Sequence, residues 1–234
     1  MRKELLTPKA WLCLTIMALF AVLLFASPQR VSATVINFDS LNATSGVITG
    51  APVTSYLASY GITTSNMTPG GVLGVVDVTS WGYLAPPSSP NVFSMWGPTP
   101  YGDSFTMNFA NAVDNFSLTR SGYIGAKSPS GNVLGNWSAI AYTGANVALG
   151  SVGESMIASY VDIPMQTFTL AYSGIDHITF SADAHGWAGC QMPMMDNLTF
   201  TAAPVPEPST LLLFGSGLVG LAGLGRKFRK HTSL

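Results

Sequence analysis

Cysteine is nearly absent from this chain, which has 234 residues and two cysteines. Cys13 lies in an N-terminal apolar stretch that we expect to be removed, which leaves Cys190 as the only cysteine of the mature protein. No internal disulfide can then form. The body must be held together by its hydrophobic core, and we expect Cys190 to be a small buried residue rather than a nucleophile.

Basic residues are equally scarce in the middle of the chain. Residues 34–203 contain only Arg120 and Lys127, against nine acidic residues, eight Asp and Glu154. The net charge of this part is therefore −7. Proteins that bind nucleic acids need basic patches, so this class of partner is excluded. An acidic body is compatible with divalent cations.

The residue types of hydrolytic catalysis are also few. Residues 34–203 contain one glutamate and two histidines, His177 and His185. Neither Gly-x-Ser-x-Gly nor His-Glu-x-x-His occurs. We expect His177 to face solvent on a strand and His185 to lie in a loop. The sequence therefore favours a protein that is not an enzyme, and a secreted hydrolase is the least favoured alternative.

The N-terminus has the pattern of a secretory signal peptide. Three basic residues lie within the first nine positions, and residues 11–25 form an uncharged apolar run. Val31-Ser32-Ala33 then offers small residues to signal peptidase, so we predict cleavage after Ala33. Cleavage after Ala26, or an uncleaved anchor, are the alternatives.

The body lacks any long amphipathic helical pattern and consists of short apolar or Thr-rich runs between Gly, Pro, Asn and Ser. In residues 104–109, Phe105, Met107 and Phe109 alternate with polar residues, which is the period of a strand with one buried face. Such strands form antiparallel sheets with one solvated face. We therefore predict an all-β, antiparallel two-sheet β-sandwich, similar to a jelly roll. The expected strands are 35–38, 72–78, 92–96, 104–109, 113–119, 138–142, 156–161, 167–172, 177–181 and 197–201, with one short helix at 53–60.

The C-terminus has three consecutive parts. Val205-Pro206-Glu207-Pro208-Ser209-Thr210 is extended and stiff, because each proline fixes φ and restricts the residue before it. Residues 209–225 contain no charge and would span roughly 26 Å as a helix at about 1.5 Å per residue. A basic cluster that should stop transfer and stay cytoplasmic follows, consisting of Arg226, Lys227, Arg229 and Lys230.

This tail resembles the PEP-CTERM sorting signal of exported bacterial proteins. The resemblance implies a membrane-anchored precursor, removal of the tail by an exosortase, and delivery to the cell surface or extracellular matrix. It divides the chain into a signal peptide (1–33), an ectodomain (34–203) and a sorting signal (204–234). The alternative is an ordinary tail anchor with a Pro-rich stalk.

The body also resembles a β-sandwich that recurs on PEP-CTERM proteins and is similar in architecture to carbohydrate-binding modules. That resemblance implies a structural or adhesive surface protein, or alternatively a module that binds exopolysaccharide. The matching segments are Ile36-Asn37-Phe38-Asp39, Tyr60-Gly61-Ile62, Ser89-Pro90-Asn91, Ala112-Val113-Asp114-Asn115-Phe116 and Met195-Asp196-Asn197-Leu198-Thr199-Phe200.

Two sets of residues are candidate sites. Asp39 and Asp196 lie at the edges of the first and last predicted strands, and would approach each other if these strands pair antiparallel. The resemblance implies a structural calcium ion there, completed by backbone carbonyls, whereas two capping aspartates are the alternative. The second set could stack on sugar faces and comprises Trp81, Tyr83, Trp96 and Tyr101. The alternative is that Trp96 lies in the core and the others pack under loops.

Overall fold

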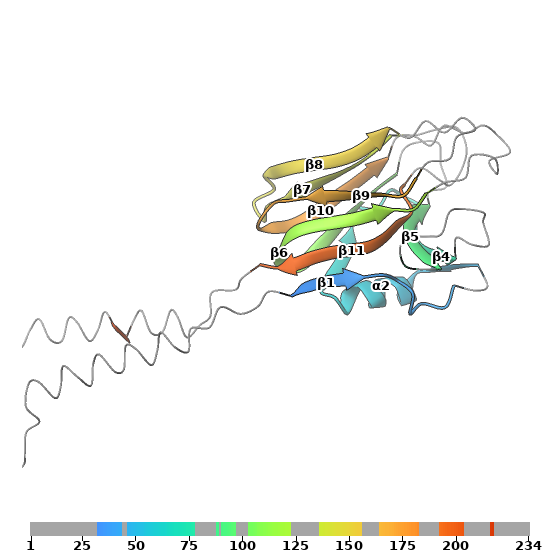
Figure 1. The fold of residues 1–234 in the computed structure, drawn as a ribbon, viewed down its shortest axis with the longest axis horizontal. Coiled ribbons are helices and arrows are strands. Elements are labelled where there is room, and N and C mark those ends of the chain that lie inside the picture. The colour runs from blue at the N-terminus through green and yellow to red at the C-terminus, as the bar shows by residue number, and fades with distance from the viewer. Residues whose placement is uncertain are drawn as a thin grey trace, which may run out of the picture. The chain divides into compact units, whose positions relative to one another are not determined.

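Figure 1 shows the computed structural model of the chain. The structure describes residues 32–43, 46–77, 88, 90–96, 103–122, 136–155, 164–182, 192–203 and 216–217. The chain divides into two units, Met1–Ser32 and Ala33–Leu234, of which the first lies outside the described residues except for Ser32.

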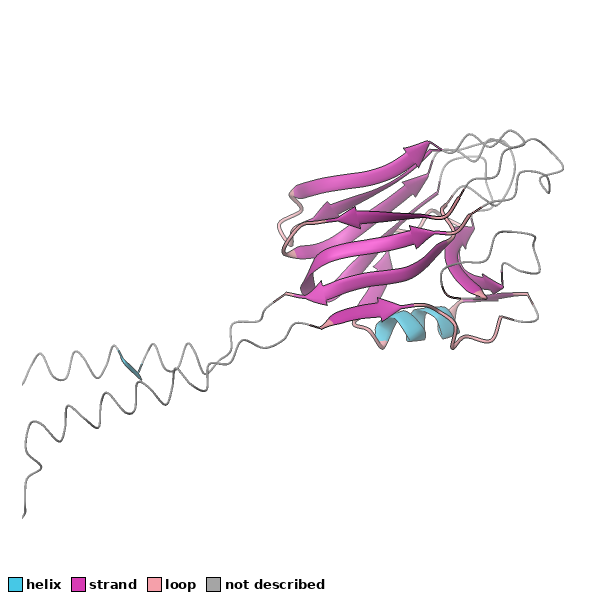
Figure 2. Cartoon of the chain, viewed as in Figure 1, coloured by secondary structure: helices cyan, strands magenta, loops and turns pink. Residues whose placement is uncertain are grey.

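The second unit is built almost entirely of strands, with one short helix among the described residues of the body (Figure 2). The strands are β1 (Ala33–Ile36), β2 (Val47–Thr49), β3 (Ile62–Ser65), β4 (Val72–Asp77), β5 (Asn91–Trp96), β6 (Asp103–Arg120), β7 (Asn136–Tyr142), β8 (Ala148–Ser155), β9 (Gln166–Leu170), β10 (Ile175–Ala182) and β11 (Met195–Ala202). The helix is α2 (Ala51–Ala58), which begins with Pro52 in its first turn and buries Val53 and Leu57 one turn apart.

The long strand β6 organises the sheet, because its two halves have different partners. Its first half pairs with β3 on one side and β10 on the other, and β10 continues to β7 and β8. Its second half pairs with β9 and β11, and β11 continues to β1, to β5, and through β5 to β4 and β2. All of these pairings are antiparallel. One hydrogen-bonded network therefore passes between two layers and forms an antiparallel β-sandwich.

The core lies between these layers. The rings of Phe93 and Phe105 meet edge to face at 5.9 Å, and Phe116 meets Phe180 at 6.5 Å, so each pair joins one layer to the other. Each such fully buried side chain contributes about 1.5–3 kcal/mol of stability. The predicted alternation is confirmed in β6, where Phe105 and Met107 are fully buried.

The predicted all-β class is confirmed, and the helix expected at 53–60 is present as α2. Two details differ, and one expected strand is not tested. The segments predicted as separate strands at 104–109 and 113–119 are the single strand β6. The strands β2 and β3 were not predicted because they have only three and four residues. Strand β8 was not predicted because it is rich in Gly and Ser. The strand expected at 156–161 lies outside the described residues.

The predicted membrane span at 209–225 also falls almost wholly outside the described residues. Among the residues that the structure does describe, no helix has the length and apolar character needed to cross a bilayer.

Candidate functional site

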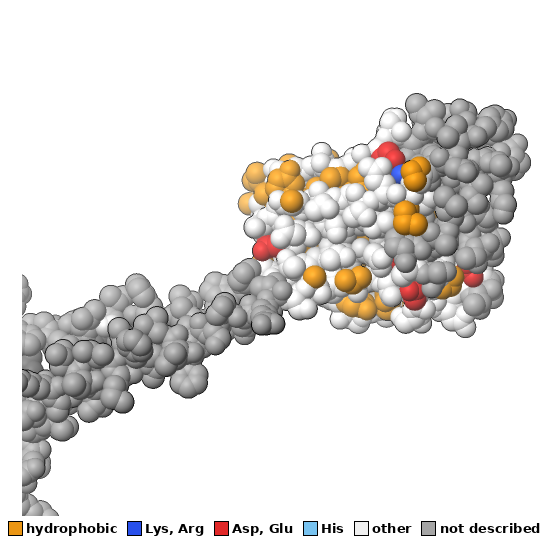
Figure 3. Space-filling model, viewed as in Figure 1, with side chains coloured by type: hydrophobic (Ala, Val, Ile, Leu, Met, Phe, Trp, Pro, Cys, Tyr) orange, Lys and Arg blue, Asp and Glu red, His pale blue; other side chains and the backbone are white. Residues whose placement is uncertain are grey.

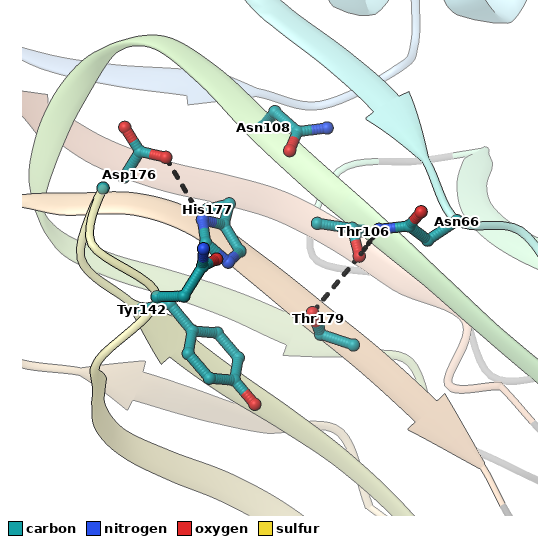
Figure 4. Close-up of a pocket in the computed structure, with 9 residues that line it drawn as sticks. Asn66, Thr106, Asn108, Tyr142, Asp176, His177 and Thr179 are labelled. Atoms are coloured by element: carbon teal, nitrogen blue, oxygen red, sulfur yellow. Dashed lines mark hydrogen bonds and ion pairs between the residues drawn. The ribbon is translucent and has the colours of Figure 1, made fainter.

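The first layer of the sandwich consists of β3, the first half of β6, β10, β7 and β8. A groove of about 450 Å³ crosses its outer face (Figure 4). This volume is within the range of small-molecule sites. Its floor comes from three adjacent strands: Thr106 and Asn108 from β6, His177 and Thr179 from β10, and Tyr142 from β7. These residues are the polar positions of alternating strands whose other positions enter the core.

The register of the strands places three floor residues in one row. His177 pairs directly with Asn108 on one side and with Tyr142 on the other. Because neighbouring strands lie about 4.8 Å apart, the row is roughly 10 Å long. Thr106 and Thr179 are a second directly paired set beside it.

The walls come from turns. Asn66 follows β3, and Gly144 and Asn146 lie in the turn between β7 and β8. That turn is closed by a hydrogen bond from the Asn146 N–H to the Thr143 carbonyl at 2.9 Å, and Asn146 adopts the left-handed conformation that Asn tolerates (φ 58°). A side chain at Gly144 would come within 3.3 Å of an Asp176 carboxylate oxygen, so glycine leaves this wall open.

Asp176, His177 and Tyr142 form a connected set. Asp176 Oδ2 lies 3.1 Å from His177 Nδ1, and the His177 and Tyr142 rings stack at 5.0 Å with an interplanar angle of 9°. An ionised carboxylate only accepts hydrogen bonds, and the His177 tautomer that donates from Nδ1 to Asp176 has Nε2 as an acceptor. The side chain of His177 is only 14% exposed, so the expectation that it faces solvent is corrected: it is on the outer face but is largely covered.

Hydrogen bonds also join the asparagine and threonine side chains of the groove. Thr106 Oγ1 and Thr179 Oγ1 are 3.2 Å apart, and Asn66 Nδ2 donates to Thr106 Oγ1 at 3.5 Å. Asn108 Nδ2 donates to Ser65 Oγ at 2.9 Å. The amide nitrogens are thus engaged, and the amide oxygens of Asn66 and Asn108 accept no hydrogen bond from described residues.

The groove contains one ionisable acid and no basic lysine or arginine among its described lining residues. On the described part of the one face that Figure 3 draws, few atoms belong to charged side chains. The described groove is therefore rich in acceptors and nearly neutral.

A second polar cluster surrounds Asp196, and includes the predicted partner Asp39. The approach of these two aspartates was expected only if the first and last strands pair antiparallel, and β1 and β11 do pair in this way. Asp196 is completely buried, and accepts hydrogen bonds from the Ser88 and Asn197 N–H groups at 2.9 and 2.6 Å. Ser88 Oγ lies 2.9 Å from Asp196 Oδ2.

Two oxygens of this cluster are buried without a hydrogen-bond partner among the described residues, Asp39 Oδ1 and Asn91 Oδ1. Asn91 Nδ2 donates to the Phe38 and Leu41 carbonyls at 3.0 and 2.6 Å, which places the amide against the turn that carries Asp39. Buried acceptors without donors are costly, and they are also what a cation requires. The described residues contain no group of three or more His, Cys, Asp or Glu positioned to hold a metal, so backbone and amide oxygens would have to complete a cation site.

Burial raises the pKa of Asp196 to about 6, and the nearby Asp39 adds to this rise, while the hydrogen bonds from Ser88 and Asn197 lower it. The folded-state pKa is thus above the ordinary value of 3.8. Between these two values the folded state binds more protons than the unfolded state, so stability falls as pH rises from about 4 to about 6. The loss amounts to roughly 3 kcal/mol, unless a cation favours the ionised form.

A third cluster is a buried ion pair at the end of β6. Arg120 is 1% exposed, and its Nε and Nη2 donate to the two carboxylate oxygens of Glu154 at 2.6 and 2.8 Å. Nη1 donates to the Ser121 and Pro164 carbonyls at 2.9 and 3.0 Å. This pair joins β6 to β8 and the segment before β9, which is a structural role rather than a binding role.

The remaining predicted site residues lie outside the described part of the chain, with one exception. This holds for the PEP segment Val205–Thr210, the basic cluster at 226–230, and the aromatic residues Trp81, Tyr83 and Tyr101. Trp96 is the last residue of β5, and only its backbone is described. The sugar-stacking prediction therefore stays a prediction. The groove was not predicted, although its residues occupy the polar positions of recognisable strands.

Comparison with known proteins gives one specific match. Residues 204–230 match the family model of the PEP-CTERM protein-sorting motif. The chain therefore carries this motif, which indicates an exported, exosortase-sorted protein made as a membrane-anchored precursor. No curated protein matches the chain.

The similar solved structures are distant. They include the enzymatically active domain of bacteriophage CBA120 tailspike protein 4 (14% identity, TM-score 0.37, covering 61% of this chain and 19% of that one). The MgGH51 α-L-arabinofuranosidase in its arabinose-bound form has 15% identity and a TM-score of 0.39, covering 64% and 24%. TmCBM61, solved with β-1,4-galactotriose, has 14% identity and a TM-score of 0.34, covering 62% and 93%. This chain thus spans about a fifth to a quarter of the first two proteins, and the likeness assigns no activity to it.

Proposed function

We propose that this chain, which carries a PEP-CTERM protein-sorting motif, is a non-enzymatic protein of the bacterial cell surface or extracellular matrix. Signal peptidase removes residues 1–33, residues 209–225 hold the precursor in the inner membrane, and an exosortase cuts near Pro206-Glu207-Pro208. The observation that carries the proposal is the match at residues 204–230. The order of its parts supports it, because the basic cluster fixes the cytoplasmic side and leaves the PEP segment outside.

We propose that the body has a structural or adhesive role. Its surface is poor in basic charge, and its jelly-roll-like sandwich supports wide, uncharged polar faces. Glycoside hydrolysis ordinarily needs two carboxyl groups flanking the scissile bond, whereas Asp176 is the only carboxylate among the described lining residues of the groove. This arrangement favours binding over hydrolysis.

Carbohydrate binding is the second candidate function of the body, and the groove favours it. Hydrogen-bonding side chains and an aromatic ring line an open depression of suitable volume.

Mass spectrometry of the mature protein from its native host tests the proposed export. We expect an N-terminus at Thr34 and a C-terminus that excludes residues 209–225, recovered from the cell surface or medium. A mature N-terminus before Ser27 would contradict signal-peptide removal. A mature protein that retains residues 209–230 in an exosortase-containing host would contradict sorting, and would favour a tail anchor.

We further propose that the Asp39–Asp196 cluster holds a structural calcium ion. The unpartnered Asp39 Oδ1 and Asn91 Oδ1 and the buried Asp196 carboxylate fit a hard cation, which prefers oxygen ligands. The ion would offset the unfavourable burial of ionised Asp196 at neutral pH. It would have no role in a reaction.

Millimolar calcium should raise the melting temperature of the chelator-treated mature protein at pH 7, because a ligand that binds only the folded state stabilises it by mass action. In Asp196→Asn this rise should disappear, because the substitution removes the ligand charge but keeps the shape. Asp114→Asn, a carboxylate outside the cluster, should respond as the unsubstituted protein does. If calcium leaves the unsubstituted protein's melting temperature unchanged, the two aspartates are capping residues only.

A further inference from the structure

We propose that the groove between β3, β6, β10 and β7 binds a neutral saccharide, with Asp176, His177 and Asn108 accepting hydrogen bonds from its hydroxyl groups and Tyr142 covering an apolar sugar face. This inference deepens the carbohydrate-binding candidate above and rests on it. It places the site on the outer face of the first layer, on residues other than the aromatic ones that the sequence suggested.

The hydrogen-bonding capacity of the groove selects a ligand rich in donors. The Asp176 carboxylate is an acceptor, and so is Nε2 in the His177 tautomer that donates from Nδ1 to Asp176 Oδ2. The amide nitrogens of Asn66 and Asn108 already donate to protein oxygens, which leaves their carbonyl oxygens as acceptors. A polyhydroxylated ligand supplies donors at close intervals, whereas a carboxylate or phosphate supplies none.

The charge of the groove favours neutral over acidic saccharides. The body has only two basic residues, and Arg120 is buried and bonded to Glu154. Lys127 lies outside the described residues, and no basic side chain lies among the described lining residues. A uronate or sulfated sugar would therefore meet Asp176 without a compensating cation, and like charges repel at short range.

The stacked rings supply the apolar part of the site. Tyr142 and His177 stand parallel on neighbouring strands, each limiting the rotation of the other. A ring held in one orientation loses little conformational entropy when a ligand binds. On its other side, Tyr142 pairs with Ala148 of β8, whose small side chain leaves space beside the tyrosine ring. Figure 4 shows Tyr142 and His177 at one end of the groove and Asn66 and Thr106 at the other.

The length of the site indicates a short stretch of a chain rather than a single buried sugar. Asn108, His177 and Tyr142 form a row of roughly 10 Å across three strands. The groove is open beside Asp176, whose side chain is 46% exposed. An open row accepts an internal segment of a polysaccharide, because the chain can leave the groove at either end.

The test is affinity electrophoresis and calorimetry of the mature protein with three sets of probes. These are neutral oligosaccharides of several linkages, uronate-containing oligosaccharides, and amine-bearing chitosan oligosaccharides. Membrane-bound precursor extracted in detergent is measured in parallel, since it carries the same body. Saccharide binding can then be measured even if the protein is not exported, and export can be assessed even if no saccharide binds.

We expect at least one neutral probe to bind, and the affinity to fall about tenfold or more in Tyr142→Ala and in Asp176→Asn. Matched controls lie outside the groove: Tyr172→Ala, an exposed tyrosine, and Asp114→Asn. Both controls should bind as the unsubstituted protein does. Asp176→Asn keeps the side-chain shape, so unchanged thermal unfolding in this variant attributes its loss of binding to the groove rather than to misfolding.

Three results would overturn the proposal. The first is absence of binding to every neutral probe. The second is binding that survives both groove substitutions, or that is lost instead when Trp81 and Trp96 are replaced, which would place the site on the aromatic stretch. The third is preference for the amine-bearing probe that Asp176→Asn removes, which would identify a site for cationic ligands.

Discussion

Glu154→Ala is expected to lower the free energy of unfolding of the body by about 3–5 kcal/mol, as is typical when one partner of a buried ion pair is removed. Arg120 is fully buried, and two of its nitrogens would lose their acceptors while the charge stayed in place. Small domains have a total stability of about 5–15 kcal/mol. The variant should therefore be close to unfolding, which urea denaturation followed by circular dichroism would measure.

The control is replacement of both partners, Arg120→Met with Glu154→Leu. Apolar residues of similar volume remove the desolvation penalty together with the attraction, so the double variant should be near the unsubstituted protein or more stable. Asp176→Asn, in the half-exposed pair with His177, should change the unfolding free energy by less than about 1 kcal/mol. A single variant as stable as the unsubstituted protein would show that the pair does not stabilise the junction between β6 and β8.

The strands that could be predicted from the sequence are those in which large apolar residues alternate with polar ones. Phe105, Met107 and Phe109 marked β6, and all three are buried. The continuation of β6 through Ala110 and Ala112 could not be recognised, since small residues give no clear alternation of apolar and polar side chains. β8 was missed for a related reason: its residues bury little, and it is held by backbone pairing with β7, which is a non-local property.

The two candidate sites also differ in how far they could be predicted from the sequence. Asp39 and Asp196 could be brought together from sequence, because pairing of the first and last strands is a single topological assumption and places both near one edge. The groove depends on the order and register of β6, β10 and β7, which are far apart in the chain. A one-residue slip in any of them would turn Asn108, His177 or Tyr142 into the core. Polar alternation shows which face is outward, but not which strands are neighbours.

Replacing Pro206-Glu207-Pro208 by three alanines is expected to block processing completely while leaving membrane insertion intact. Insertion depends on the uncharged run at 209–225 and on the basic residues that follow it, and neither is changed. In the sorting that we propose, the exosortase requires an extended substrate at a fixed distance from the bilayer, and the two prolines favour that geometry because they exclude helix. Alanine, the best helix former, would allow the apolar helix to extend through the site.

The unsubstituted protein should reach the surface without its tail, whereas the variant should accumulate in the membrane with residues 204–234 attached. Cell fractionation and mass spectrometry of the C-terminus distinguish these forms. Pro204→Ala is the matched control, since it removes a neighbouring proline but keeps the tripeptide, and it should be processed normally. Deletion of the exosortase in the host should give the unsubstituted protein the fate of the triple-alanine variant. If the triple-alanine variant instead acquires the same mature C-terminus as the unsubstituted protein, cleavage does not read the Pro-Glu-Pro segment, and the tail is an anchor whose rigid stalk only separates the body from the bilayer.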